Sequence, residues 1–190
     1  DEFSSEDDMI FLDANENPYP SNYNRYPDPL QTKLKNTIVS IKQVKAEQIF
    51  IGNGSDEPID LLFRIFCRPA VDHVIILPPT YGMYEVAAQI HDTPVVSIPL
   101  NEAFQPDYDS IMAAVNPYSK ILFLCSPNNP TGNLLDPLTV ERLIQSFPGV
   151  VVVDEAYIDF ASSESFTARI DAYQNFIVLQ TLSKAWGLAG

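Results

Sequence analysis

The 190-residue sequence lacks a long apolar run, has few basic residues and contains only two cysteines. No apolar run approaches the roughly 20 residues of a transmembrane helix, so an integral membrane protein is not expected. Eleven basic residues stand against 25 acidic ones, and the net charge of −14 would repel a polyanion, which argues against a general nucleic-acid surface. A small phosphorylated ligand remains compatible with this charge if a local pocket supplies donors.

The opening of the chain and the cysteines both favour a cytoplasmic protein. Residues 1–8 are acidic, whereas a secretory leader begins with positive charge followed by an apolar stretch. Cys67 and Cys125 lie in apolar segments, which predicts buried free thiols in place of a disulfide or a metal pair. We predict no metal site.

The pattern of apolar residues predicts an α/β fold. Residues 1–29 are rich in Asn, Pro, Asp and Tyr without a regular period, which indicates an extended N-terminal arm. From residue 30 to 190, strands that are apolar on both faces alternate with helices, which implies a mostly parallel sheet covered by helices on both sides. We therefore predict an arm over 1–29 and one large domain over 30–190. The expected strands cover 74–77, 94–98, 120–125, 150–153 and 176–179, and the expected helices cover 30–44, 58–67, 81–90, 107–115 and 137–146.

A glycine-containing segment, residues 52–57, precedes the second predicted helix. It resembles the front of a dinucleotide fingerprint but lacks the third glycine, which disfavours a nicotinamide-binding fold. The backbone N–H groups of Ser55 and Asp56 at the helix start could instead bind a phosphate. The alternative is an ordinary helix that one of these residues caps, with Pro58 in the first turn.

Three further motifs follow predicted strands at their carboxyl ends, where open α/β sheets bind ligands. The segment 126–132 is either part of a site or a plain turn of Asn, Pro and Gly. Asp154 ends an apolar strand, where its carboxylate needs a cationic or donor partner or caps a following helix. Lys184 follows the hydroxyl residues Thr181 and Ser183, and it is either a solvated surface lysine or an amine that can attack an aldehyde.

Taken together, these motifs resemble the fold-type I pyridoxal-phosphate (PLP) enzymes, which form the aspartate-aminotransferase superfamily. Within it they look most like the histidinol-phosphate aminotransferase family. The resemblance also includes residues 12–19, 25–28, 52–57 and 79–84. It implies the PLP-transferase large domain and PLP as the cofactor.

The resemblance implies a role for each matching residue of the domain. Lys184 would hold the cofactor as a Schiff base and act as the catalytic base, while Asp154 would pair with the ring nitrogen. Tyr157, also counted as catalytic, and Asn129 would hydrogen-bond the 3′ oxygen of the cofactor. Tyr81 would stack on its ring. The phosphate would be held by Ser55, Asp56, Thr181 and Ser183.

The resemblance also assigns roles to the arm. Asn15 and Tyr19 would contact the substrate, unless they only pack the arm onto its own domain. Tyr26 would reach the cofactor phosphate of the neighbouring subunit, which implies a homodimer. The implied reaction, in histidine biosynthesis, is amino transfer between L-histidinol phosphate and 2-oxoglutarate, with imidazole acetol phosphate and glutamate as products.

The sequence departs from the family pattern after Lys184. The family continues with an arginine for the cofactor phosphate and a small domain, whereas this sequence stops at Gly190. We expect a fragment that lacks the C-terminal small domain and has negligible transaminase activity alone. The alternatives are threonine-phosphate decarboxylation, aromatic transamination, a non-catalytic PLP-binding regulatory module, or a protein with no cofactor.

Overall fold

The computed structural model describes residues 12, 14–19 and 21–189. The chain divides into two compact units, Asp1–Ile51 and Gly52–Gly190. The acidic opening lies outside the described residues, as does part of the predicted arm. The arm and domain boundary at residue 29 stays a prediction.

The first unit contains the helix that was predicted over residues 30–44. Asp28 organises its start, because its carboxylate accepts hydrogen bonds from the N–H groups of Leu30 and Thr32, both at 2.9 Å. The helix ends where Gln43 turns into the left-handed region at φ 56°, a conformation that ends many helices. The elements of this unit are α1 (Thr32–Lys42) and the short 3-10 helix η1 (Ala46–Gln48), which was not predicted.

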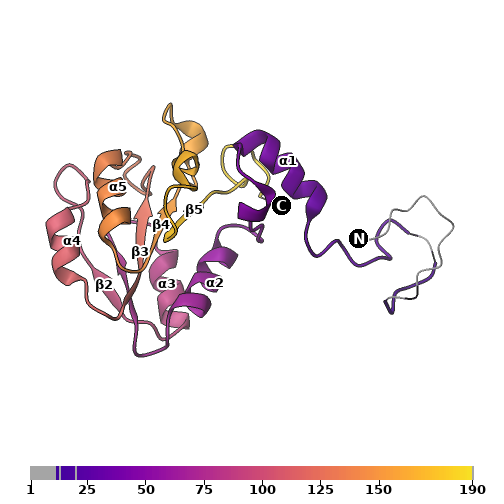
Figure 1. The fold of residues 1–190 in the computed structure, drawn as a ribbon, viewed down its shortest axis with the longest axis horizontal. Coiled ribbons are helices and arrows are strands. Elements are labelled where there is room, and N and C mark those ends of the chain that lie inside the picture. The colour runs from indigo at the N-terminus through magenta and orange to yellow at the C-terminus, as the bar shows by residue number, and fades with distance from the viewer. Residues whose placement is uncertain (1–11, 13, 20, 190) are drawn as a thin grey trace. The chain divides into compact units, whose positions relative to one another are not determined.

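The second unit is built on a five-stranded sheet, and the sequence prediction of a parallel α/β sheet is confirmed (Figure 1). All neighbouring strands are parallel, in the order β2-β1-β3-β4-β5. The strands are β1 (His73–Ile76), β2 (Val95–Ser97), β3 (Ser119–Cys125), β4 (Val150–Asp154) and β5 (Phe176–Leu179).

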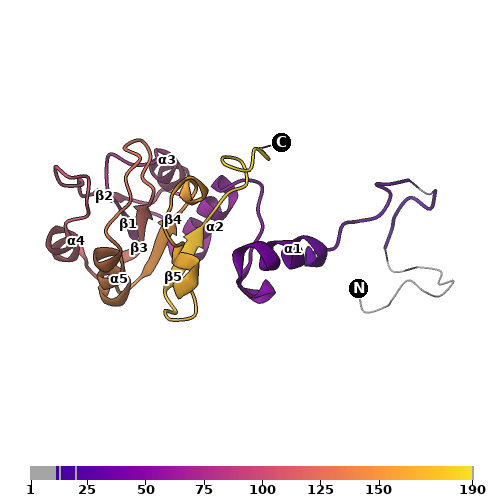
Figure 2. The same ribbon diagram turned by 90° about the horizontal axis from the view of Figure 1, so that it is seen from above.

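Helices cover both faces of this sheet, which makes three layers (Figure 2). On β4, Val151 and Val153 face one apolar core while Val152 faces the other, because successive strand residues point to opposite faces. Helices α4 and α5 close the first core, and helices α2 and α3 close the second. The helices are α2 (Asp56–Phe66), α3 (Met83–Ile90), α4 (Tyr108–Ala114) and α5 (Pro137–Ser146), and the 3-10 helices η2 (Ile158–Phe160) and η3 (Phe166–Arg169) follow β4.

The strand order creates a switch point between β1 and β3. The chain runs from β1 outward to β2 and then returns across the sheet to β3, β4 and β5. In open α/β sheets, ligands bind beyond the carboxyl ends of the strands at such a point. The segments that leave these ends are therefore the place to look for a site.

The start of one helix agrees with the sequence prediction, and the starts of two others differ from it. Helix α5 begins as predicted, since the Asp136 carboxylate accepts the N–H of Thr139 at 2.9 Å and Pro137 suits the first turn. Helix α3 begins at Met83 and not at residue 81, because Gly82 is its N-cap. Helix α2 starts two residues earlier than predicted, at Asp56.

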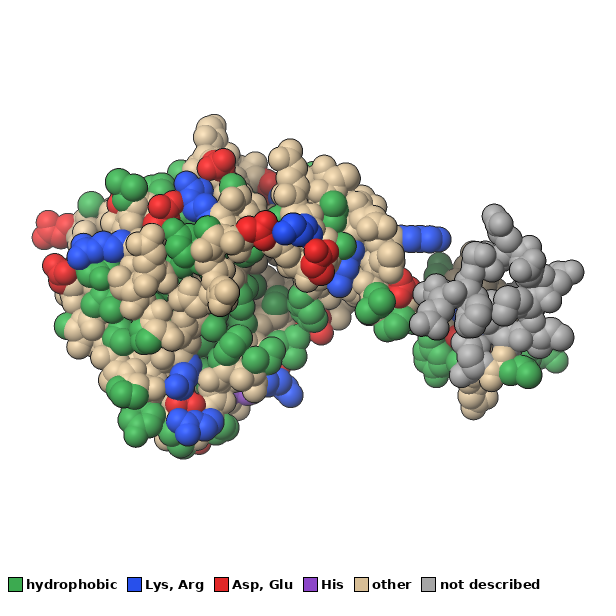
Figure 3. Space-filling view, viewed as in Figure 1, with side chains coloured by type: hydrophobic (Ala, Val, Ile, Leu, Met, Phe, Trp, Pro, Cys, Tyr) green, Lys and Arg blue, Asp and Glu red, His purple; other side chains and the backbone are tan. Residues whose placement is uncertain are grey.

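Both cysteines are free, as predicted, but only Cys125 is fully buried and Cys67 is half-buried. None of the helices in the described ranges is long and apolar enough to cross a membrane. On the face of the second unit seen in Figure 3, lysine and arginine side chains occur at separate places among acidic and apolar ones.

Candidate active site

A cavity of about 170 Å³ lies where the carboxyl ends of the strands meet the start of α2. Its walls come from the loop before α2, the segment between β1 and α3, and the segments that follow β3, β4 and β5. Nine of the predicted site residues line this one cavity: Ser55, Asp56, Tyr81, Asn129, Asp154, Tyr157, Thr181, Ser183 and Lys184. The sequence prediction that they meet at one sheet edge agrees with this geometry, while their roles toward a cofactor stay predictions.

Asp154 is the most deeply placed acid of this cavity, and its side chain is almost wholly buried at the end of β4. Its Oδ2 accepts a hydrogen bond from the Tyr84 hydroxyl at 2.6 Å, and its Oδ1 accepts the N–H of Ala156 at 3.0 Å. Burial raises the pKa of Asp154, these two donors oppose that rise, and the charge of Asp56 adds to it. A buried carboxylate with two neutral donors suits a cationic ligand.

The alternative prediction, that Asp154 caps a following helix, is confirmed only in part. The bond from Ala156 is a local turn of the kind that aspartate favours. The next element is the 3-10 helix η2, and its N-cap is Tyr157 and not Asp154. Capping therefore does not account for the burial of Asp154 or for its contact with Tyr84.

The start of α2 offers backbone N–H groups to the cavity. Gly54 adopts φ 71°, a conformation that other residues rarely adopt, and so turns the chain into the helix. Ser55 is the N-cap, but its side chain makes no capping hydrogen bond among the described residues. The first N–H groups of a helix have no acceptor within it, which makes them a natural anion site.

Two carboxylates in the first turn of α2 are already engaged by neighbouring groups. The Asp56 carboxylate accepts a hydrogen bond from the Tyr81 hydroxyl at 3.2 Å. Burial, followed by the charge of Asp56, raises the pKa of Tyr81 to about 12, so this hydroxyl stays protonated near neutral pH. Glu57 accepts hydrogen bonds from the backbone and side chain of Asn53.

The loop after β5 brings the predicted hydroxyl pair together. Thr181 Oγ1 lies 3.1 Å from Ser183 Oγ and accepts the N–H of Ser183 at 3.2 Å. Lys184 follows, exposed at the cavity wall, with its Nζ 5.9 Å from the centroid of the Tyr157 ring. Trp186 ties the loop to η2, because its Nε1 donates to Asp159 Oδ2 at 2.9 Å. Lys184 is thus solvated, as the simpler reading expected, but it also faces the site.

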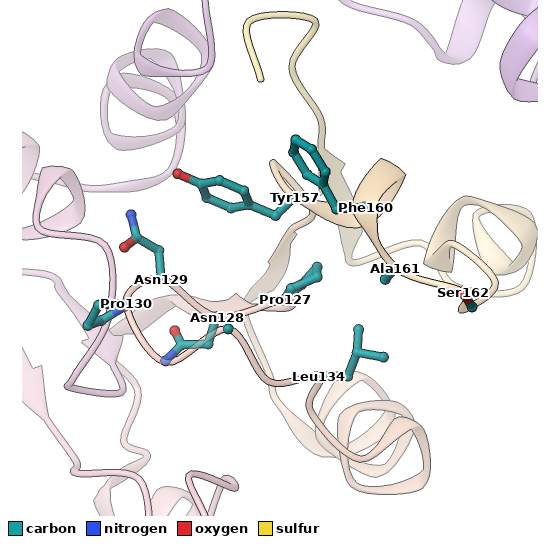
Figure 4. A pocket seen from close by; sticks show the side chains of 10 residues that line it. Pro127, Asn128, Asn129, Pro130, Leu134, Tyr157, Phe160, Ala161 and Ser162 are labelled. Carbon is teal, nitrogen blue, oxygen red and sulfur yellow. The ribbon is translucent and has the colours of Figure 1, made fainter. Parts of the chain in front are cut away.

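A larger cavity of about 590 Å³ shares Asn129 and Tyr157 with the first one. In Figure 4 the polar ends of these two side chains point toward the same side, and Leu134 and Phe160 lie on the other walls. The segment that carries Asn129 is held by Asn128, whose buried amide donates to Pro79 O at 2.9 Å and to Thr131 Oγ1 at 2.7 Å. The segment 126–132 is therefore a fixed wall of the site as well as a turn.

The remaining predicted residues belong to the first unit, so the structure does not place them against the cavity. Asn15, Tyr19 and Tyr26 are exposed within that unit. Glu16 accepts hydrogen bonds from the Arg25 side chain and from the N–H of Tyr26. The substrate and subunit contacts of the arm stay predictions.

Sequence reasoning assigned no role to two buried residues that shape the site. In the helix that was predicted over residues 81–90, Tyr84 lies three positions after Tyr81, and this spacing was the signal available. In the structure Tyr81 precedes α3, and the two rings still meet edge-on. Glu155 follows Asp154 and is equally buried. Its carboxylate accepts hydrogen bonds from Ser165 Oγ, the N–H of Phe166 at 2.7 Å and Gln180 Nε2 at 2.8 Å, and no local pattern predicts these partners.

Comparison with known proteins gives a consistent result. The sequence model described as aminotransferase class I and II matches residues 11–190. The histidinol-phosphate aminotransferase of Cytophaga hutchinsonii is 59% identical over 184 residues, which cover 95% of this chain and 53% of that protein. The chain spans about half the length of the relatives that it matches.

Solved structures show the same likeness. The histidinol-phosphate aminotransferase from Clostridium acetobutylicum superimposes with a TM-score of 0.77 at 27% identity, over 86% of this chain and 49% of that one. The L-threonine-O-3-phosphate decarboxylase from Porphyromonas gingivalis follows with a TM-score of 0.72 at 26% identity, over 87% and 51%.

Proposed function

The chain belongs to the aminotransferase class I and II family, and from this premise we propose that it forms the cofactor-binding part of a histidinol-phosphate aminotransferase. The proposed reaction moves an amino group between L-histidinol phosphate and 2-oxoglutarate, a step of histidine biosynthesis. Enzymes of this family use PLP. The identity of 59% to the Cytophaga hutchinsonii protein supports the choice of substrate.

The observation that carries the proposal is the single cavity lined by both Asp154 and Lys184. When bound, PLP supplies an aldehyde that reacts with amines and an aromatic ring that accepts the electrons released at the substrate Cα. The cavity offers a matching group for each part of such a ligand. It has a carboxylate for a protonated ring nitrogen, an amine for the aldehyde, and N–H and hydroxyl donors for the phosphate.

Asp154 is proposed to keep the proton on the ring nitrogen. Two neutral donors stabilise the charge of this buried carboxylate. Among the described residues it has no cationic partner in hydrogen-bond contact, and a protonated ring nitrogen would supply one. Asn129 and Tyr157 are proposed to donate to the 3′ oxygen and to orient the ring, and Tyr81 to stack on it. Such pre-arranged donors and charges act where charge develops during reaction.

Lys184 is proposed to bond covalently to the cofactor and to move the substrate proton. Its Nζ would take up and return the proton at the substrate Cα. The hydrogen bond from Trp186 to Asp159 holds the loop that carries Lys184. The phosphate is proposed to lie at the start of α2, held by the N–H groups of Ser55 and Asp56 and by the hydroxyls of Thr181 and Ser183.

We also propose a cytoplasmic homodimer for the full-length protein. In it, Tyr26 would reach the cofactor phosphate of the neighbouring subunit, and Asn15 and Tyr19 would contact the substrate. The exposure of the Tyr19 and Tyr26 side chains, 78% and 73%, supports contacts outside their own unit.

A comparison of amino donors tests the proposed reaction. The full-length protein is loaded with PLP, and glutamate formation from 2-oxoglutarate is measured with histidinol phosphate, phenylalanine and threonine phosphate. We expect histidinol phosphate to give the highest kcat/KM. A preference for phenylalanine would point to aromatic transamination. Release of carbon dioxide from threonine phosphate would point to the decarboxylase activity named for the Porphyromonas gingivalis protein, and turnover of none would favour a regulatory module.

A further inference from the structure

Tyr84 is fixed on two sides by other aromatic rings. It is the second residue of α3 and its side chain is fully buried. Its ring stacks on Phe123 of β3, with centroids 4.5 Å apart and planes 13° apart, and it meets Tyr81 edge-on at 5.6 Å. Offset and edge-on contacts of this kind hold a ring in one orientation. The packing therefore aims the hydroxyl at one point, the end of β4.

That point is the carboxylate of Asp154. The Tyr84 hydroxyl donates to Oδ2 at 2.6 Å across a sequence separation of 70 residues. The N–H of Ala156 occupies Oδ1 at 3.0 Å. With one donor on each oxygen the carboxylate plane is set from both sides, and each oxygen keeps further acceptor capacity for a ligand. Hydrogen bonds to an ionised oxygen are short and about twice as strong as neutral ones.

The surroundings of this pair otherwise oppose a charge on Asp154. Burial raises its pKa, and the carboxylate of Asp56 on α2 acts in the same direction. Lys184 and Tyr157 line the same cavity. Two further titratable groups there, Tyr81 and Cys125, are neutral near pH 7, since burial first and then nearby acids raise their pKa values to about 12. Burial raises the pKa of Tyr84 as well, so its hydroxyl remains a proton donor.

We propose that Tyr84 is a positioning residue that keeps Asp154 ionised and oriented for a cationic ring nitrogen. The inference rests on the proposed function for the identity of that ring, but the contact between Tyr84 and Asp154 exists without it. Tyr84 lies behind the acid, and it acts on the ligand through Asp154 alone.

The Tyr84→Phe variant removes the hydroxyl and keeps the ring that stacks on Phe123. In the full-length protein we expect PLP to bind about 10-fold or more weakly, the size of the loss of a hydrogen bond to a charged group. The ¹⁵N resonance of isotope-labelled PLP should move toward the value of an unprotonated ring nitrogen. A purely structural role would not move that resonance.

The matched control is Tyr108→Phe. Tyr108 lies on α4, on the other face of the sheet, and its hydroxyl donates to Ser146 Oγ at 2.9 Å. This variant also removes a tyrosine hydroxyl and its hydrogen bond, here to a neutral partner, and should leave both the affinity and the ¹⁵N resonance unchanged. In an Asp154→Asn background, Tyr84→Phe should have little further effect on either readout, because there is no charge left to stabilise.

The outcomes separate the inference from the proposed function. If the unmodified protein does not bind PLP, the proposed function fails and the inference falls with it. If it binds PLP and Tyr84→Phe matches it in affinity and ¹⁵N resonance, only the inference is overturned. If the Tyr84→Phe variant does not fold, a measurement on the unmodified protein still tests the charge of Asp154. Isotope-edited infrared spectra, compared with those of Asp154→Asn, should show Asp154 as a carboxylate at pH 7, and a protonated Asp154 would overturn the inference.

Discussion

The Nζ of Lys184 lies 5.9 Å from the centre of the Tyr157 ring, so the segments after β4 and β5 present their functional side chains to the same space. The two strands are neighbours in the sheet, with Asp154 paired to Leu179 in register. Loops that leave adjacent parallel strands at the same level therefore lie next to each other. The convergence of an amine and an acid on one cavity follows from this register.

The charge of Asp154 can be removed without changing its size in the Asp154→Asn variant. We expect turnover of the PLP-loaded protein to fall about 100-fold or more, because a charge placed to stabilise the reaction is lost. Cofactor affinity should fall less than turnover. Steady-state kinetics and a PLP titration measure the two effects. Asp136→Asn is the control, since asparagine caps a helix as well as aspartate, and a loss of turnover in that variant as large as in Asp154→Asn would contradict this role of Asp154.

Glu155 links the ends of β4 and β5 to η3 through its buried carboxylate. The Glu155→Gln variant turns an acceptor into a partial donor that faces three donors, and we expect a loss of about 1–3 kcal/mol in the free energy of unfolding. Urea unfolding followed by circular dichroism gives this value. Glu164→Gln is the control, because its exposed ion pair with Arg169 should be worth little. Equal stability of the two variants would refute this role for Glu155.

Asp72 should make the stability of the fold depend on acid pH. Its buried carboxylate pairs with the Arg68 guanidinium through two hydrogen bonds of 2.9 Å, and this pairing holds the pKa of Asp72 well below its usual range. A carboxyl whose pKa is lowered by folding stabilises the protein above its unfolded pKa of about 3.9, and this contribution is lost as the pH falls through the folded value.

The Asp72→Asn variant tests this dependence. The difference in unfolding free energy between it and the unmodified protein should be largest near neutral pH and should shrink below about pH 4. Glu85→Gln, at an exposed position of α3, should show a smaller change. A difference between Asp72→Asn and the unmodified protein that stays constant from pH 7 to pH 3 would show that ionisation of Asp72 does not contribute.

The sheet and most of the cavity were predictable because their signals are local. Apolar runs such as Val151 to Val153 are buried on both faces, and polar residues that follow such runs must lie at the carboxyl edge. Tyr84 and Glu155 were missed for the opposite reason, because their partners come from distant segments. A sequence pattern does not show that the hydroxyl of Tyr84 meets a carboxylate 70 residues further along. The short 3-10 helices have too few residues for a periodic pattern.

The amine of Lys184 is the group on which the proposed chemistry depends most, and borohydride trapping tests its role directly. The full-length protein is incubated with PLP, reduced with borohydride and digested, and its peptides are analysed by mass spectrometry. We expect a phosphopyridoxyl group on Lys184, loss of the absorbance band near the visible edge, and no such band in the Lys184→Ala variant. Labelling of other lysines such as Lys120, with Lys184 unmodified, would contradict this role.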